Sequence, residues 1–515
     1  MPSFRIPKSL MVLVEFIQLT SSSMIRSPQT RIKNQYRKTI PQKKKRQLHD
    51  HILKEATRQQ AIYQRMSWRD YQKSLNQTKN SYKRLKRIFL GAVLVSIVVG
   101  IISTLLPPLM RDDPLPPDQS VGLPTKAANH TEQAPLESKK IEIRAILDDR
   151  KLLNLTKENL EIVYNQQHYL VVTSLDPVLQ NTLIKYFDKI NSRYIGIVAM
   201  DPTTGRILAF TGFNKTSIDL NPCTTNKFPA ASIFKIITAA AAAEKLGYSS
   251  DTLLKFNGKK HTLYKNQLKD RENRYTNRIS FRNSFAQSVN PVFGKIGALR
   301  LGKEALQKYG EYFGFNRNFN TEFHIAPSHL SVTEDTYHHA EIACGFNRDT
   351  TLSPVHAAMI VTAMLNGGKM IEPTIINRII SESGQTIYNG SYAARNQVIN
   401  SKTSDMIQDM MEATIRSGTA RKTFRGYTRD KVLKKLMIGG KTGSIFNKAH
   451  NVRFDWFVGF AKTKDLSEKM VISAVVAHEE YIGRRAGEYA RIAFKTHFKN
   501  YFAKKEAKQH LEKKS

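Results

Sequence analysis

The chain is poor in cysteine and in acidic residues. Its 515 residues include two cysteines, Cys223 and Cys344, which excludes a disulfide framework and a thiolate zinc cluster but leaves open a single bond between them. The 14 histidines do not follow the spacing of a zinc-protease helix, so we expect neither a metal nor a cofactor. The 43 acidic residues face 80 Lys and Arg, a net charge of +37 that favours anionic partners.

Long apolar runs are also scarce, and one of them has the length of a bilayer span. Residues 88–106 contain no charged side chain and would form a helix about 28 Å long. Lys83, Arg84, Lys86 and Arg87 precede this run, so the positive-inside rule predicts a cytoplasmic N-terminus and places the residues after the run outside. Because 87 residues come first, we expect an uncleaved transmembrane helix rather than a signal peptide.

The segments beside this run have biased compositions. Residues 1–87 carry 21 Lys and Arg against 4 Asp and Glu, which predicts a largely disordered cytoplasmic tail attracted to anionic lipid. No nucleic-acid recognition fold is evident in the tail, so specific nucleic-acid binding is not expected. Residues 107–140 form a Pro-rich spacer. We expect a short segment over 141–193, a single domain over 194–503 and a basic tail over 504–515.

Apolar runs in the domain predict strands and a central helix. Residues 195–201 and 206–212 are two apolar runs joined by Pro-Thr-Thr-Gly, the pattern of a hairpin. Residues 231–246 predict a helix that is apolar almost all round, with Gly247 placed to end it, and such a helix is normally buried.

Further elements are expected near the C-terminal end. The runs at 436–444, 455–461 and 471–478 predict three strands, and 484–502 predicts a helix. Two early strands and three late strands then form one sheet by pairing across the intervening sequence.

The start of the central helix carries a nucleophile beside an amine. Ser232 and Lys235 stand three residues apart, which puts the hydroxyl and the ammonium on one helix face. The helix N-terminus offers free backbone amides to an oxyanion formed by attack of Ser232. An apolar setting and a second cation would favour a neutral Lys235 that accepts the serine proton.

Two further short patterns follow in a fixed order. Ser288-Val289-Asn290 comes after the helix, and Lys441-Thr442-Gly443-Ser444 lies at the end of a predicted strand. Each pattern is weak alone; their order and their placement on a helix start and a strand are specific.

With these patterns the chain resembles the penicillin-binding proteins, the serine D,D-transpeptidases related to the serine β-lactamases. The likeness extends over about residues 169–502 and includes the segments Asp-Pro-Thr-Thr-Gly-Arg at 201–206, Gly-Thr-Ala-Arg at 418–421 and Trp-Phe-Val-Gly-Phe at 456–460. It implies an α/β sandwich in which an antiparallel sheet of about five strands lies between helical layers.

The resemblance also implies catalytic roles. Ser232 would attack the penultimate D-alanine carbonyl of a peptidoglycan stem peptide, and Lys235 would be the general base. Ser288 would relay a proton to the leaving amine, with its reactivity tuned by Lys441, and Asn290 would hold a substrate amide.

In this resemblance, the pattern Lys441-Thr442-Gly443-Ser444 supplies the substrate-binding groups. Thr442, Gly443 and Ser444 would bind substrate, and the backbone amides of Ser232 and Ser444 would form the oxyanion hole, which is worth about 3–4 kcal/mol per donor. The acyl group would pass to an amine of a neighbouring strand, and β-lactams would acylate Ser232 and stall there.

The chain departs from the larger members of the family. The stretch between the apolar run and the first predicted strand is too short for a glycosyltransferase domain, so we expect a separate glycan polymerase as partner in the bacterial inner membrane. The remaining alternatives are a D,D-carboxypeptidase, a class D-like β-lactamase, and a non-catalytic penicillin sensor or wall-binding scaffold. The first of these would use the same residues with water as the acceptor.

Overall fold

The computed structural model describes residues 140–144, 146–147, 149–217, 220–390, 395–448 and 451–512. The chain divides into two units, residues 1–125 and 126–515, and every described residue belongs to the second. The expected cytoplasmic tail (1–87), transmembrane helix (88–106) and most of the Pro-rich spacer (107–140) therefore lie outside the described residues. Among the helices that the structure describes, none is both long enough and apolar enough to cross a bilayer.

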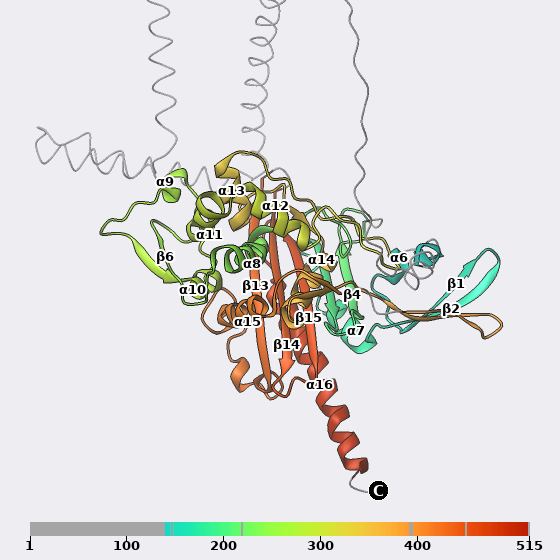
Figure 1. The fold of residues 1–515 in the computed structure, drawn as a ribbon. Coiled ribbons are helices and arrows are strands. Elements are labelled where there is room, and N and C mark those ends of the chain that lie inside the picture. Colours follow the sequence, from blue (N-terminus) through green and yellow to red (C-terminus); the bar gives the residue numbers. More distant parts are fainter. Residues whose placement is uncertain are drawn as a thin grey trace, which may run out of the picture. The chain divides into compact units, whose positions relative to one another are not determined.

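A five-stranded antiparallel sheet forms the centre of the described unit (Figure 1). Its strands in spatial order are β13 (Leu436–Asn447), β14 (Val452–Thr463), β15 (Lys469–His478), β3 (Ser192–Met200) and β4 (Ile207–Asn214). The register pairs Val471 with Met200 and Val475 with Gly196, so strands from the two ends of the domain lie side by side. The predicted pairing of early and late strands across the sequence is confirmed.

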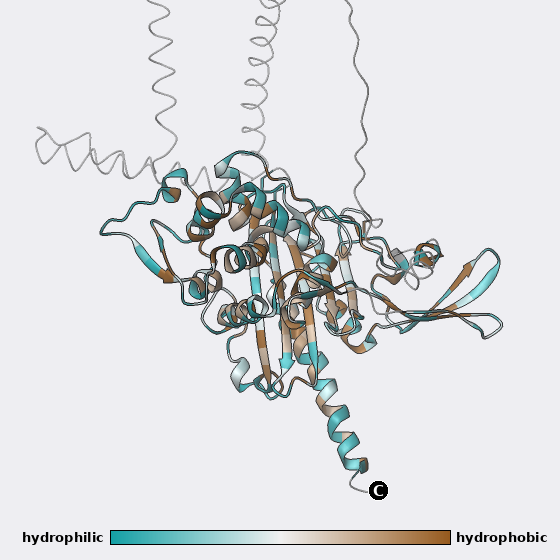
Figure 2. Cartoon of the chain, viewed as in Figure 1, coloured by the Kyte–Doolittle hydropathy of each residue, from teal (hydrophilic) through white to brown (hydrophobic). Residues whose placement is uncertain are grey.

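Both faces of this sheet are buried. Side chains alternate between the two faces of a strand, so successive residues of one strand enter different cores. In β15, Val471 and Val475 enter the larger core, whereas Ile472, Ala474 and Val476 enter the second core. Hydrophobic residues accordingly run along the central strands in Figure 2. The continuous apolar runs seen in the sequence are the signature of this two-sided burial.

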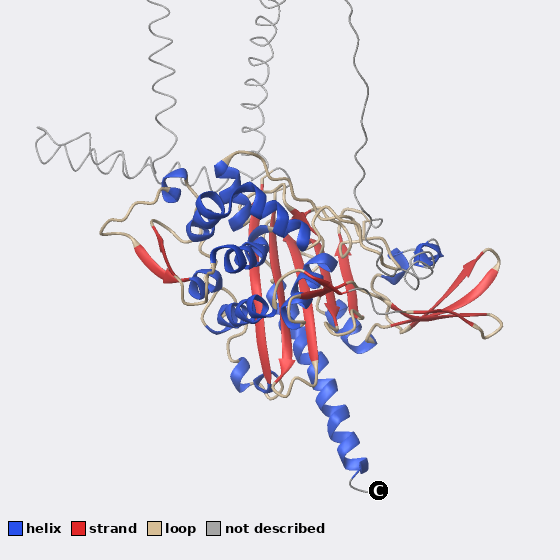
Figure 3. Ribbon diagram, viewed as in Figure 1, coloured by secondary structure: helices blue, strands red, loops and turns tan. Residues whose placement is uncertain are grey.

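Helices cover the sheet on both sides (Figure 3). The helices of the larger core are α8 (Lys235–Leu246), α10 (Phe281–Ala286), α11 (Asn290–Ile296), α12 (Gly302–Tyr312), α13 (Thr336–Cys344), α14 (Pro354–Leu365) and α15 (Ser401–Arg416). The second core lies under α7 (Pro177–Lys185) and α16 (Ala486–Glu512). The expected sheet between helical layers is confirmed.

Short elements complete the described unit. A second antiparallel sheet has the order β1 (Asn159–Tyr164), β2 (Gln167–Thr173), β10 (Ile376–Ser381) and β11 (Thr386–Asn389). Three two-stranded pairs join β5 (Phe228–Pro229) to β8 (Thr351–Leu352), β6 (Leu253–Phe256) to β7 (Asn277–Ser280), and β9 (Lys369–Ile371) to β12 (Arg395–Gln397). The remaining helical turns are α6 (Asp149–Leu152), η1 (Ala231–Phe234), α9 (Lys265–Leu268), η2 (Gly297–Leu301), η3 (Tyr427–Arg429) and η4 (Leu433–Lys435).

The two predicted helices differ from the structure at their ends. The helix expected over 231–246 begins with the 3₁₀ turn η1, and α8 starts only at Lys235; tight 3₁₀ turns are frequent at helix N-termini. The helix expected over 484–502 runs to Glu512 as α16, so it takes in most of the segment expected as a separate basic tail over 504–515. That segment is rich in Lys and Glu, which favour a helix without adding an apolar face.

Candidate active site

The 3₁₀ turn η1 presents Ser232 directly before the buried helix α8. Lys235 begins α8 and is fully buried, and its Nζ donates a hydrogen bond to Ser232 Oγ at 2.8 Å. The i to i+3 spacing that the sequence suggested therefore brings hydroxyl and amine into contact. Gly247 ends α8 in the left-handed conformation, with φ of +66°, as predicted.

Three acceptors surround the Lys235 amine. Besides Ser232 Oγ, Nζ donates to Asn290 Oδ1 at 2.8 Å and to the Cys344 carbonyl oxygen at 2.5 Å. An ammonium has three N–H donors, so these acceptors satisfy its protonated form completely. Once Lys235 loses a proton, its lone pair can accept the proton of the Ser232 hydroxyl.

Burial changes the acid–base properties of both lysines in the site. It lowers the pKa of Lys235 to about 8, because a charged amine loses hydration inside the protein. Burial and the positive charge of Lys235 together lower the pKa of Lys441 well below its usual range. The neutral amine that the chemistry requires is thereby accessible near neutral pH.

Ser288 and Asn290 lie where α11 begins, and both are buried. Ser288 has a φ of +54°, a conformation rare outside glycine that often marks functional sites. Lys441 Nζ donates to Ser288 Oγ at 3.0 Å and to the Thr442 carbonyl oxygen at 2.8 Å. All five catalytic residues predicted from the sequence thus come together at one site, with Lys235 bonded to Ser232 and Asn290 and Lys441 bonded to Ser288.

The predicted binding residues lie on β13, the edge strand of the sheet. A Cβ placed on Gly443 would stand 3.3 Å from the Ala231 Cβ and 3.4 Å from Ile233 Cδ1, so the strand passes directly beside η1 at this position. An edge strand has unpaired backbone groups on one side. The main chain at Gly443 is therefore positioned beside the turn that carries Ser232.

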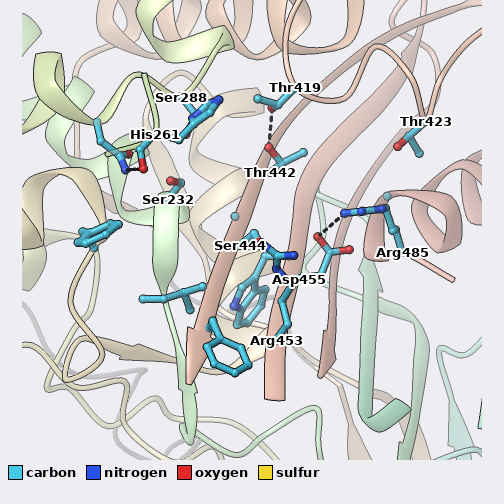
Figure 4. Close-up of a pocket in the computed structure, with 18 of the residues that line it drawn as sticks. Ser232, His261, Ser288, Thr419, Thr423, Thr442, Ser444, Arg453, Asp455 and Arg485 are labelled. Carbon is cyan, nitrogen blue, oxygen red and sulfur yellow. Dashed lines mark hydrogen bonds and ion pairs between the residues drawn. The ribbon is translucent and has the colours of Figure 1, made fainter. Parts of the chain in front are cut away.

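A cavity of about 570 Å³ opens over these groups. Figure 4 shows Ser232, Ser288 and His261 gathered at one end of the cavity and Asp455 and Arg485 toward the other. Thr442, Gly443 and Ser444 also line it, and Thr419 Oγ1 lies 2.5 Å from Thr442 Oγ1. Within the described ranges, no three His, Cys or acidic residues are grouped so that they could hold a metal ion.

Several residues of the site were not identified from the sequence. His261 lines the cavity from the loop that follows β6. The Cys344 carbonyl oxygen accepts a hydrogen bond from Lys235. Burial raises the pKa of the Cys344 thiol to about 11, so the thiol stays protonated. Cys223 and Cys344 are both buried thiols and form no disulfide. No local pattern could have revealed these positions, because they reach the site only through long-range packing.

An acidic and basic pair marks the far end of the cavity. The Asp455 Oδ2 accepts a hydrogen bond of 3.0 Å from the Ala486 amide at the start of α16. The Arg485 Nη1 lies 3.9 Å from Asp455 Oδ1, and Arg453 lines the cavity beside them. The carboxylate therefore ties the sheet to the N-terminus of α16, where negative charge is favourable.

Comparison of the sequence with known proteins finds a matching family and a curated relative. The family model described as "Penicillin binding protein transpeptidase domain" matches residues 195–498. The chain is 27% identical over 320 residues to stage V sporulation protein D of Bacillus subtilis, an alignment that covers 57% of this chain and 48% of that protein. The chain therefore spans about half the length of this curated relative.

Solved structures share the fold at low sequence identity. The D,D-transpeptidase domain of a peptidoglycan glycosyltransferase from Eggerthella lenta has a TM-score of 0.53 and 20% identity, and the match covers 64% of this chain and 83% of that domain. Penicillin-binding protein A from Mycobacterium tuberculosis, in a ceftriaxone acyl-enzyme complex, has a TM-score of 0.51 and 19% identity, with coverage of 63% and 78%.

Proposed function

This chain belongs to the penicillin-binding protein transpeptidase family, and on that premise we propose that it is a peptidoglycan D,D-transpeptidase that cross-links stem peptides through an acyl-enzyme on Ser232. One observation carries the proposal. The Lys235 Nζ lies 2.8 Å from Ser232 Oγ, and Lys441, bonded to Ser288, contributes a second amine to the same site. A serine hydroxyl is a weak nucleophile until a neighbouring base takes its proton, and Lys235 is in position to do so.

Acylation begins with the neutral form of Lys235. With a pKa of about 8, about a tenth of the molecules hold Lys235 neutral at pH 7. Lys235 takes the Ser232 proton while Oγ attacks the penultimate D-alanine carbonyl. The backbone amides of Ser232 and Ser444 receive the oxyanion. The proton then reaches the leaving D-alanine amine through Ser288, which Lys441 holds in place.

The second half reverses these steps with a new amine. The acceptor amine attacks the acyl carbonyl, the bond to Ser232 Oγ breaks, and the proton that the amine nitrogen loses passes through Lys235 to Ser232 Oγ. Thr442 and Ser444 hold the substrate carboxylate, and the partly exposed Thr442 hydroxyl is already oriented by Thr419. A β-lactam would acylate Ser232 in the same way. Its leaving nitrogen would stay covalently attached to the acyl group after the lactam ring opens, so the adduct would persist.

The test is to label the full-length protein with a fluorescent penicillin. We expect a stable covalent adduct on the parent protein and none on Ser232→Ala. Ser383→Ala, on the exposed turn between β10 and β11, is the matched control and should label as the parent does. Absence of label on the parent protein would contradict the proposal and favour a non-catalytic wall-binding scaffold.

The same experiment separates the other candidate functions. Rapid loss of the label would indicate a β-lactamase rather than a wall enzyme. Incubation with a stem peptide and an acceptor amine would then distinguish transfer from hydrolysis, because a carboxypeptidase would release only the shortened peptide. A penicillin sensor would form the adduct and release no product from the stem peptide.

We also propose a single-pass arrangement in the bacterial inner membrane. Residues 88–106 would span the bilayer, residues 1–87 would lie in the cytoplasm near anionic lipid, and the catalytic domain would lie outside. This proposal is supported by the uncharged apolar run and its basic N-terminal flank. Glycan polymerisation would be supplied by a separate membrane enzyme.

An impermeant maleimide tests this arrangement, because both natural cysteines are buried. In spheroplasts, Ser383→Cys should react, whereas Ser74→Cys in the tail should react only after the membrane is permeabilised. Equal reaction of both variants in intact spheroplasts would contradict the topology.

A further inference from the structure

The main chain around His261 is fastened to the segment that carries Ser288 and Asn290. The backbone N–H of Asn290 donates to the Lys260 carbonyl oxygen at 2.6 Å, and the side-chain Nδ2 of Asn290 donates to the His261 carbonyl oxygen at 3.2 Å. These bonds hold the imidazole in the cavity wall, at the end that contains Ser232 (Figure 4).

The surroundings of the imidazole favour its neutral form. Partial burial lowers the pKa of His261, and the positive charges of Lys235, Lys441 and Lys260 lower it further, against the opposing effect of the Ser288 main chain. A neutral imidazole has one ring nitrogen with a lone pair that can accept a proton. His261 is exposed at the cavity mouth, where it can exchange protons with water.

The proposed transfer reaction needs a base for the acceptor amine in addition to Lys235. An acceptor amine arrives as an ammonium near neutral pH and must lose one proton before its nitrogen can attack. It loses a second proton after the attack, and Lys235 carries that proton back to Ser232. The first proton therefore needs another acceptor. Lys441 is fully buried and bonded to Ser288, whereas His261 is exposed at the cavity mouth, where the acceptor arrives.

We propose that His261 is a further catalytic residue, the base that deprotonates the incoming acceptor ammonium; this inference rests on the proposed transpeptidase function. The ammonium gives one proton to the free ring nitrogen of His261. The amine lone pair then forms the C–N bond, the ester C–O bond to Ser232 breaks, and the remaining proton passes through Lys235 to Ser232 Oγ. The His261 imidazolium releases its proton to water.

The test compares aminolysis with acylation in the full-length protein. A D-alanyl thioester serves as acyl donor and glycine as acceptor, and mass spectrometry measures the ratio of amide to hydrolysed acid. Fluorescent penicillin measures acylation separately. His261→Gln keeps a polar side chain at this position but takes up no proton, and His168→Gln, exposed on β2, is the matched control.

For His261→Gln we expect an amide-to-acid ratio at least about tenfold below the parent value, in line with general base catalysis, with penicillin acylation within about twofold of the parent. The deficit should shrink at alkaline pH, where the acceptor already lacks its proton. His168→Gln should match the parent protein in both measurements.

An unchanged ratio in His261→Gln would overturn the proposal. Equal losses of acylation and aminolysis, or a deficit that does not change with pH, would also overturn it and indicate that His261 only positions Ser288 and Asn290. A parent protein that accepts no penicillin would instead contradict the proposed function itself, and this role with it.

Discussion

Lys235 links burial to reactivity at the scale of a single residue. Its amine is enclosed by Ser232, Asn290 and Cys344 oxygens, which favour the ammonium, while full burial opposes charge and lowers the pKa to about 8. A surface lysine would remain almost wholly protonated at neutral pH. The site therefore gains a usable base from desolvation.

The acylation rate should follow the titration of Lys235. Because the neutral amine is the active form, the second-order rate constant for penicillin should rise about tenfold per pH unit below pH 8 and level off above it. Time courses of fluorescent labelling between pH 6 and 9 measure this profile.

Lys235→Arg provides the control for this profile, since a guanidinium stays charged throughout the range. It should acylate at least about 10²-fold more slowly and show no plateau near pH 8. A parent profile that is flat from pH 6 to 9 would rule out Lys235 as the titrating base.

The neighbourhood of Ser288 and Asn290 was only partly predictable. Their place beside Lys235 and Lys441 follows from the family resemblance and is realised by hydrogen bonds of 2.8 and 3.0 Å. The contribution of His261 was missed, because the residue lies in a loop without periodic pattern and reaches the site through Asn290.

At the scale of elements, the residue that follows α13 packs against η1, the turn that carries Ser232. Gly345 follows α13 with a φ of +68°, and a Cβ on it would stand 1.8 Å from the Ala231 carbonyl oxygen and 2.8 Å from the Ser232 nitrogen. No side chain fits at that distance. The close approach of two segments far apart in the chain is therefore what orients Ser232.

Gly345→Ala should lower the free energy of unfolding by about 2–4 kcal/mol and slow penicillin acylation, because both backbone strain and steric overlap oppose it. Gly384→Ala is the matched control: its φ is +82°, yet a Cβ there meets nothing within 4 Å. It should cost roughly 1 kcal/mol without affecting acylation.

Thermal unfolding and the labelling rate measure both variants. If Gly345→Ala behaves like Gly384→Ala in the two assays, contact between α13 and η1 does not determine the geometry of Ser232.

The strands were the most predictable elements. β3, β4 and β15 are buried on both faces and read as apolar runs in the sequence. The end of α16 was not predictable, because residues beyond 502 contact solvent and carry no apolar period.

At the scale of the described unit, one buried carboxylate joins distant segments. Glu322 is fully buried, and its Oε1 accepts hydrogen bonds from Thr374 Oγ1 at 2.7 Å and from the Tyr388 hydroxyl at 2.8 Å. Nearby, Lys140 and Arg144 donate to main-chain oxygens at Asn320 and Thr321. The segment around Lys140 and the β10–β11 hairpin thus both attach to the loop that carries Glu322.

Tyr388→Phe should lower the free energy of unfolding by about 1–3 kcal/mol, because it leaves a buried carboxyl oxygen with one donor fewer. Penicillin acylation at 25 °C should stay within about twofold of the parent protein, since neither Tyr388 nor Glu322 lines the active-site cavity.

Tyr481→Phe serves as the comparison because that side chain is 67% exposed, and it should leave the unfolding midpoint unchanged. Equal midpoints for the two variants would contradict the role of the Glu322 cluster.

Features of this protein that depend on neighbours along the chain could be predicted from the amino-acid sequence. The spacing of Ser232 and Lys235, the apolar runs of the strands and the turn at Gly247 are local, so they could be interpreted before any fold was known. The tertiary structure alone decided that β10 and β11 extend the sheet of β1 and β2, that the Cys344 carbonyl holds Lys235, and that His261 lines the same cavity as Ser232. These contacts join residues far apart in the chain, and they are set by packing and long-range hydrogen bonds, which no local pattern encodes.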